Sequence, residues 1–184
     1  MVPALSRVSE RVGSLRSSLG ESGALQFGEF TLTSGKKSSY YVDMKTAFTD
    51  PVLLRQVAES LVPYTEGFHR VAGTELGAVP LLVSLALETG LPYLIIRKGE
   101  RAHGTEGAYE GEVQEGERVL LVEDVATTGG TLQRAINLLR DEGAVVDLAV
   151  CVVDREEGAE EKLREMGVGL EALLQTEDLH FRRP

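Results

Sequence analysis

The spacing of apolar residues changes between the first twenty positions and the next twenty. At the N-terminus, apolar residues recur at helical spacing with polar residues between them, which predicts an amphipathic helix ending near Gly20. The apolar positions are Leu5, Val8, Val12 and Leu15. In residues 26–44, β-forming residues surround the pair Ser34 and Gly35, which predicts two short strands joined by a turn.

The remainder of the chain alternates between apolar runs and helical patterns. Asp50 followed by Pro51 is typical of a helix N-cap and first helical position. Strands are predicted over residues 69–72, 92–96, 119–123 and 145–153, and helices over residues 78–87, 131–140 and 159–166. Because apolar strands that alternate with helices are buried on both faces, the pattern predicts an α/β fold with a central, mostly parallel sheet flanked by helices.

Residues 98–116 do not fit this alternation. The segment is long, rich in glycine and highly charged, and it has almost nothing to bury. Loops of this length in compact domains usually carry function or are disordered. We therefore expect a flexible lid here.

Length and charge restrict the class of protein. The 184 residues fit one ordinary domain, so we expect a single domain over residues 1–184. The formal net charge of −10 argues against a nucleic-acid partner, because such proteins need an excess of Lys and Arg to neutralise phosphates. An anionic ligand would need local basic clusters. The chain has two, Lys36 with Lys37, and Arg97, Lys98 and Arg101.

The single cysteine and the lack of long apolar stretches bear on location. Cys151 lies in an apolar run, so we expect it to fill space in the core rather than attack a substrate. No stretch reaches the roughly 18 apolar residues of a membrane span, and the N-terminus lacks the apolar centre of a signal peptide. The sequence therefore predicts a cytoplasmic protein without a membrane partner.

The strongest chemical signal lies in residues 119–131 (VLLVEDVATTGGT). An apolar strand leads into Glu123 and Asp124, and ligands in α/β sheets bind beyond the carboxyl ends of strands. A turn of small residues follows and enters a helix, where backbone N–H groups and hydroxyls can bind a phosphate. The turn consists of Val125, Ala126, Thr127, Thr128, Gly129, Gly130 and Thr131.

Such a turn alone could be merely a tight connection between a strand and a helix. The acidic pair changes this interpretation, because two carboxylates beside a phosphate repel it unless a cation or hydroxyls lie between. A ribose 5-phosphate suits both the turn and the acidic pair, because its phosphate can lie in the turn while its ring hydroxyls bind Glu123 and Asp124. The patterns GxxxxGK[ST] and GxGxxG are absent, which argues against P-loop and dinucleotide-binding proteins.

This segment resembles the phosphoribosyl diphosphate motif of type I phosphoribosyltransferases. Four other segments resemble the orotate phosphoribosyltransferases in particular. They are the hood-like residues 30–45 (FTLTSGKKSSYYVDMK), the diphosphate-loop-like residues 71–81 (VAGTELGAVPL), the catalytic-loop-like residues 95–104 (IIRKGERAHG) and the orotate-binding-like residues 152–158 (VVDREEG). The resemblance thus runs through most of the chain.

The resemblance implies a small N-terminal hood over residues 1–45, a flexible catalytic loop over residues 98–116, and transfer of a 5-phosphoribosyl group to orotate. It implies that the ribosyl donor contacts the acidic pair, the turn and the basic residues Arg97, Lys98, Arg101 and His103. Orotate would contact Thr127, Arg155 and Tyr41. The expected catalytic residues are Arg101, His103 and Asp124.

The resemblance also implies partners. Mg²⁺ would be held mainly through the oxygens of phosphoribosyl diphosphate rather than directly by the protein. The family's loop reaches the neighbouring subunit's site, so the resemblance implies a homodimer. For Arg155, the alternative from the residues alone is a surface arginine paired with Glu156 or Glu157. For Tyr40 and Tyr41, strand alternation predicts that only one faces the site.

Three positions depart from the family pattern. Arg101 stands where the family's loop usually has a lysine, and Thr33 and Gly77 stand where many members have lysine. Arg101 keeps the positive charge but changes its reach and hydration, and the lysine contacts of the family cannot be carried over to Thr33 and Gly77. A purine phosphoribosyltransferase, or a regulator that senses phosphoribosyl diphosphate without catalysis, is the alternative function.

Overall fold

The computed structural model describes residues 15–31, 37–99 and 107–176. Residues 15–21 are helical and are followed by a turn, so the described end of the N-terminal helix agrees with the prediction. Leu5, Val8 and Val12 lie outside the described residues. Leu15 and Leu19 are buried in the core.

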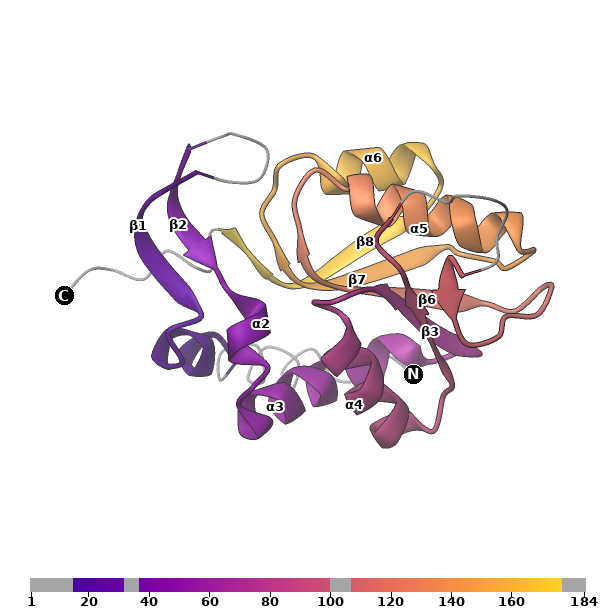
Figure 1. Ribbon diagram of the computed structural model, residues 1–184, viewed down its shortest axis with the longest axis horizontal. Helices are drawn as coiled ribbons and strands as arrows, with labels where there is room; N and C mark the ends of the chain where they lie inside the picture. Colours follow the sequence, from indigo (N-terminus) through magenta and orange to yellow (C-terminus); the bar gives the residue numbers. More distant parts are fainter. Residues whose placement is uncertain (1–14, 32–36, 100–106, 177–184) are drawn as a thin grey trace.

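Two antiparallel strands form the predicted hood at one side of the main sheet (Figure 1). Strand β1 (Leu25–Thr31) pairs with β2 (Lys37–Val42), and their register shifts between Phe27 and Phe30. The turn that joins them lies outside the described residues. A short helix, α2 (Met44–Ala47), then leads towards the main body and was not predicted.

Helix α3 (Pro51–Leu61) begins where the sequence predicted. The Asp50 carboxylate accepts hydrogen bonds from the backbone N–H groups of Val52 and Leu53 at 2.8 and 3.4 Å. These donors have no partner within the helix, so the side chain replaces the missing carbonyls. A short 3-10 helix, η1 (Val62–Thr65), connects α3 to the sheet.

The main sheet has six strands in the order β5-β4-β3-β6-β7-β8. The strands are β3 (Arg70–Thr74), β4 (Tyr93–Ile96), β5 (Tyr109–Glu110), β6 (Val119–Ala126), β7 (Leu148–Asp154) and β8 (Gly169–Gln175). All neighbours are parallel except β4 and β5. The prediction of a mostly parallel α/β sheet is confirmed.

Helices cover both faces of this sheet (Figure 1). Helices α3 and α4 (Val79–Thr89) share one apolar core with Leu120 and Val122 of β6. Helices α5 (Gly130–Asp141) and α6 (Ala159–Glu165) share a second core with Val119 and Leu121. Burial on both faces explains why β6 begins with four consecutive apolar residues.

The expectation that residues 98–116 bury almost nothing is wrong for their described part. Strand β5 lies within it, and Arg97 donates its backbone N–H to the carbonyl of Ala108 at 2.9 Å. Ala108, Tyr109 and Val113 pack against the core under α5. Within the described ranges, no helix is long and apolar enough to cross a membrane.

Candidate active site

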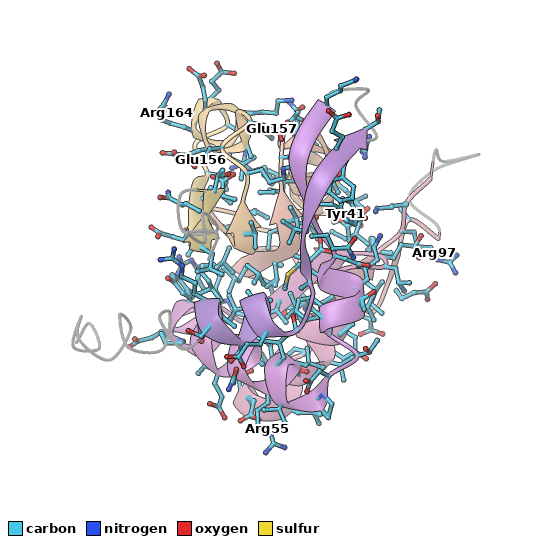
Figure 2. All side chains as sticks on the ribbon, turned by 90° about the vertical axis from the view of Figure 1, so that its left-hand side faces the viewer. Tyr41, Arg55, Arg97, Glu156, Glu157 and Arg164 are labelled. Atoms are coloured by element: carbon cyan, nitrogen blue, oxygen red, sulfur yellow. The ribbon has the colours of Figure 1, made fainter. Side chains whose placement is uncertain are left out.

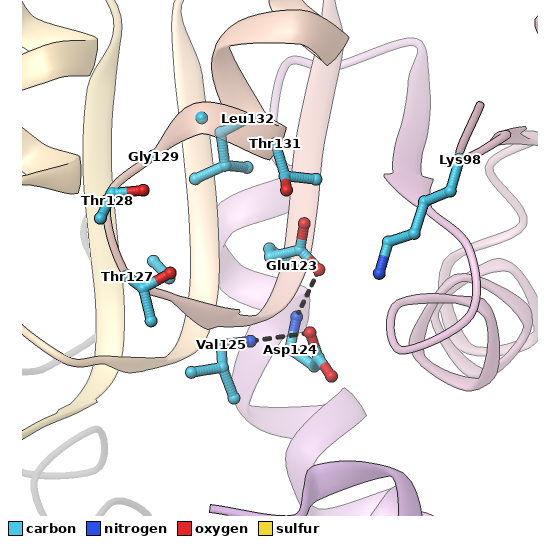
Figure 3. Close-up of a pocket in the computed structure, with 11 residues that line it drawn as sticks. Lys98, Glu123, Asp124, Val125, Thr127, Thr128, Gly129, Thr131 and Leu132 are labelled. Atoms are coloured by element: carbon cyan, nitrogen blue, oxygen red, sulfur yellow. Dashed lines mark hydrogen bonds between the residues drawn. The ribbon is translucent and has the colours of Figure 1, made fainter. Parts of the chain in front are cut away.

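A polar cavity of about 120 Å³ lies at the carboxyl end of β6 (Figure 3). The predicted acidic pair and the whole predicted turn line it, together with Lys98 from the end of β4. The lining residues are Lys98, Glu123, Asp124, Val125, Ala126, Thr127, Thr128, Gly129, Gly130, Thr131 and Leu132.

The two acidic residues have different environments because they are consecutive in a strand. Glu123 is only 6% exposed, and its Oε2 atom has no hydrogen-bond partner among the described residues. Burial, reinforced by neighbouring Asp124, raises the pKa of Glu123 well above its usual value, while Lys98 opposes the shift. Asp124 is less buried, and its Oδ1 accepts the backbone N–H of Val125 at 2.9 Å.

The turn after the acidic pair is packed against a second helix. Gly129 has a φ of 74°, and a Cβ atom there would lie 3.0 Å from Ala159 Cα at the start of α6. The Ala159 N–H also donates to the Thr127 carbonyl at 3.1 Å. Because α5 begins at Gly130, its first backbone N–H groups lie in the same turn and can bind a phosphate.

Gly77 lies directly against Asp124. A Cβ atom at position 77 would overlap the Asp124 carboxylate. The sequence suggested that the chain lacks a lysine contact at this position. In the structure, a side chain here would displace Asp124, so the glycine provides the space that the carboxylate occupies.

The basic residues expected at the diphosphate do not all lie together. Lys98 extends into the cavity towards Glu123 and Asp124 (Figure 3). Arg97 extends outward (Figure 2), is 54% exposed at its side chain, and pairs with Glu110 of β5 at 3.2 Å. Arg101, His103 and Thr33 lie outside the described residues.

Arg155 is buried, unlike the surface arginine considered from sequence. It follows β7, and its backbone N–H donates to the Ala126 carbonyl at 2.9 Å, beside the turn. Its Nε lies 3.0 Å from Glu157 Oε1, so the expected ion pair with a following glutamate is present. The residue therefore combines burial with a position at the carboxyl edge of the sheet.

Tyr41 lies in the hood rather than among the residues that line the cavity. Its ring centroid is 5.7 Å from that of Phe30 on β1, and the residue remains partly exposed (Figure 2). The side chain of Tyr40 lies outside the described part. In the described ranges, no three acidic, histidine or cysteine side chains are grouped to hold a metal ion.

The sequence reasoning missed Glu75. This residue follows β3 at the same edge of the sheet, and its carboxylate accepts the backbone N–H of Lys98 at 2.7 Å. The rule that strand ends carry functional groups could have selected it.

Comparisons with known proteins agree with this geometry. Residues 53–172 match the family model described as a phosphoribosyl transferase domain. The chain is 48% identical over 163 residues to the orotate phosphoribosyltransferase of Thermoplasma acidophilum, which covers 89% of this chain and 94% of the relative. It is 49% identical over 163 residues to that of Pyrococcus furiosus, with 86% and 90% covered.

Two solved structures extend the similarity to the fold. The orotate phosphoribosyltransferase of Aeropyrum pernix aligns with a TM-score of 0.81 and 34% identity, over 90% of this chain and 95% of that chain. The Mycobacterium tuberculosis enzyme, in complex with 5-phospho-α-D-ribosyl 1-diphosphate, aligns with a TM-score of 0.76 and 27% identity, over 93% and 99%.

Proposed function

Because the chain belongs to the orotate phosphoribosyltransferase family, we propose that the cavity at the end of β6 is its active site. The enzyme transfers the 5-phosphoribosyl group of phosphoribosyl diphosphate to orotate, giving orotidine 5′-monophosphate and diphosphate in pyrimidine biosynthesis. One observation carries the site assignment. The acidic pair, the phosphate-binding turn and Lys98 line the same cavity.

The ribosyl donor matches both the phosphate-binding turn and the acidic pair that line this cavity. The 5-phosphate binds the amides and hydroxyls of residues 126–131 at the start of α5. The ring hydroxyls donate to Glu123 and Asp124, and the first of these has a buried oxygen without a partner among the described residues. A ribose hydroxyl would therefore satisfy an acceptor that is costly to leave buried and unpaired.

The reaction is a displacement at the anomeric carbon. The orotate ring nitrogen forms the new bond and gives up its proton, the bond from the anomeric carbon to the diphosphate oxygen breaks, and its electron pair leaves with diphosphate, whose oxygens can accept the released proton. Asp124, in the proposed catalytic set with Arg101 and His103, offsets the positive charge that grows on the ribose. Lys98 offsets the negative charge on the departing group, with Arg97, Arg101 and His103 in the same proposed role.

Mg²⁺ fits the same cavity, because this ion commonly combines one or two carboxylates with substrate phosphates. Glu123 and Asp124 would be the protein carboxylates available to it, and the diphosphate oxygens would supply most ligands. When bound, the ion offsets charge on the diphosphate.

Orotate binds between the turn and the hood in this proposal. Arg155 faces the orotate carboxylate, because guanidinium groups bind carboxylates through charge-assisted hydrogen bonds. The ion pair with Glu157 fixes its orientation at the end of β7. Thr127 and Tyr41 complete the proposed orotate contacts.

An apolar stripe supports the proposed homodimer. Leu76, Val83 and Leu87 are 67%, 38% and 82% exposed, and the last two lie one turn apart on α4. Exposed apolar residues that lie together are typical of protein interfaces. Leu76 precedes α4 and adjoins Gly77, so a partner that also covered Leu76 would lie close to Asp124. This position is consistent with a loop that reaches the neighbouring site.

A direct assay tests the function. Protein is mixed with phosphoribosyl diphosphate, Mg²⁺ and orotate, and the loss of orotate absorbance is followed, with adenine, guanine and xanthine as competitors. Preference for a purine would contradict the orotate assignment, and a flat trace from folded protein would favour a sensor. The single domain over residues 1–184 and the cytoplasmic location stay predictions.

A further inference from the structure

Glu75 lies where two strand ends of the sheet meet. It directly follows β3, whose last residue Thr74 is in register with Ile96 at the end of β4. The Glu75 N–H donates to the Ile96 carbonyl at 2.8 Å, which continues the pairing by one residue. The side chain then accepts the Lys98 backbone N–H at 2.7 Å. Both contacts hold the chain as it leaves β4.

These contacts determine where the Lys98 side chain starts. Lysine has a flexible stem of four carbons, so its ammonium group is placed only as well as its backbone is fixed. In this structure the stem crosses from the end of β4 to the acidic pair on β6 (Figure 3). If the Lys98 backbone turned away, the ammonium group would leave the cavity.

A carboxylate at position 75 needs an explanation, because it lies close to the proposed diphosphate site. A carboxylate near a diphosphate site repels the ligand, so it weakens binding unless it has another effect. Its described contact is with the Lys98 amide, and hydrogen bonds with a charged acceptor are stronger than neutral ones. The Glu75 carboxylate therefore favours ligand binding by stabilising the backbone of Lys98, whose ammonium group lies in the cavity.

We propose that Glu75 is a positioning residue for diphosphate binding, which acts by fixing the Lys98 backbone through its amide. The inference rests on the proposed role of Lys98 at the diphosphate. In this proposal the Glu75 carboxylate acts on the donor only through Lys98. Its removal should affect phosphoribosyl diphosphate and leave orotate binding unchanged.

Four variants test this in steady-state kinetics with each substrate varied. Glu75→Ala should lower kcat/KM for phosphoribosyl diphosphate at least about tenfold, the lower end of the effect of one charged hydrogen bond, without changing the KM for orotate. Glu75→Gln should retain most activity, because its amide oxygen can still accept. In the Lys98→Ala background, Glu75→Ala should have little further effect, because both changes act through one side chain. Glu66→Ala, an exposed glutamate before β3, is the control.

Amide hydrogen exchange provides a reading independent of activity. The Lys98 amide should exchange faster in Glu75→Ala than in the wild type, and Glu75→Gln should restore its protection. An equal loss for both substrates, failure of Gln to rescue, or additive effects in the double variant would each overturn the inference. If Lys98→Ala leaves kcat/KM for phosphoribosyl diphosphate intact, the proposed role of Lys98 fails and the inference fails with it. If only Lys98→Ala is impaired, the role of Glu75 alone fails.

Discussion

The Gly77→Ala substitution should reduce the use of phosphoribosyl diphosphate by moving Asp124. The added methyl group would overlap the Asp124 carboxylate, and overlap of this extent cannot be relieved by a small adjustment. The carboxylate must therefore rotate away from the position in which it accepts the Val125 N–H. It would then also leave the proposed contact with the ribose hydroxyls.

The size of this effect follows from the hydrogen bond between the ribose and Asp124 that the substitution would break. A hydrogen bond with a charged partner contributes about 1.5–3 kcal/mol, so kcat/KM for phosphoribosyl diphosphate should fall about ten- to a hundredfold. The measurement is the initial rate of orotate consumption at varied donor concentration. Circular dichroism checks that the variant is folded.

Two controls separate this cause from a general effect of the added methyl group. Gly169→Ala introduces a Cβ atom 3.4 Å from Leu148 Cδ1, an ordinary contact at the start of β8, and should leave the kinetics unchanged. In an Asp124→Ala background, Gly77→Ala should cause little further loss, since the displaced group is gone. A Gly77→Ala enzyme with wild-type kcat/KM would refute the reasoning.

Three further variants test other parts of the proposal. Arg155→Ala should raise the KM for orotate far more than the KM for phosphoribosyl diphosphate, and equal effects in steady-state kinetics would mean that Arg155 is structural. Burial raises the pKa of Glu123 above its usual 4.5, so in the folded protein this group keeps a proton that the unfolded chain releases. The free energy of unfolding therefore falls as pH rises above that value, and urea denaturation should show Glu123→Gln to be more stable than the wild type at about pH 8 but not at about pH 4. Leu87→Asp should shift sedimentation from dimer to monomer, and an unchanged dimer would place the interface elsewhere.

The sequence predicted those helices and strands that are determined by residues close together in the chain. The Asp50–Pro51 pair predicted the start of α3 because capping involves neighbours in the chain. The apolar start of β6 predicted a strand buried on both faces. Strand β8 was missed because it lies at the sheet edge, where Glu171 and Gln175 interrupt the apolar pattern. Strand β5 has two residues and forms only because β4 supplies a partner.

Within the candidate site, too, the features formed by neighbouring residues could be predicted from the sequence, and those formed by tertiary packing could not. The acidic pair and the turn are contiguous in sequence, so their chemistry could be predicted together. Gly77, in the turn between β3 and α4, meets Asp124 of β6 only through tertiary packing, and no sequence pattern connects them. Glu75 and Lys98 are likewise 23 residues apart. The burial of Arg155 depends on tertiary packing, whereas its ion pair with Glu157 is local.

The support of the phosphate-binding turn by α6 has a consequence for the donor. Because the Thr127 carbonyl and Gly129 are held against Ala159, the turn is preorganised and loses little conformational entropy when it binds a phosphate. The donor is therefore anchored at its non-reacting end by a part of the enzyme that is already in place. Binding energy from that remote group can then serve to align the anomeric carbon for reaction.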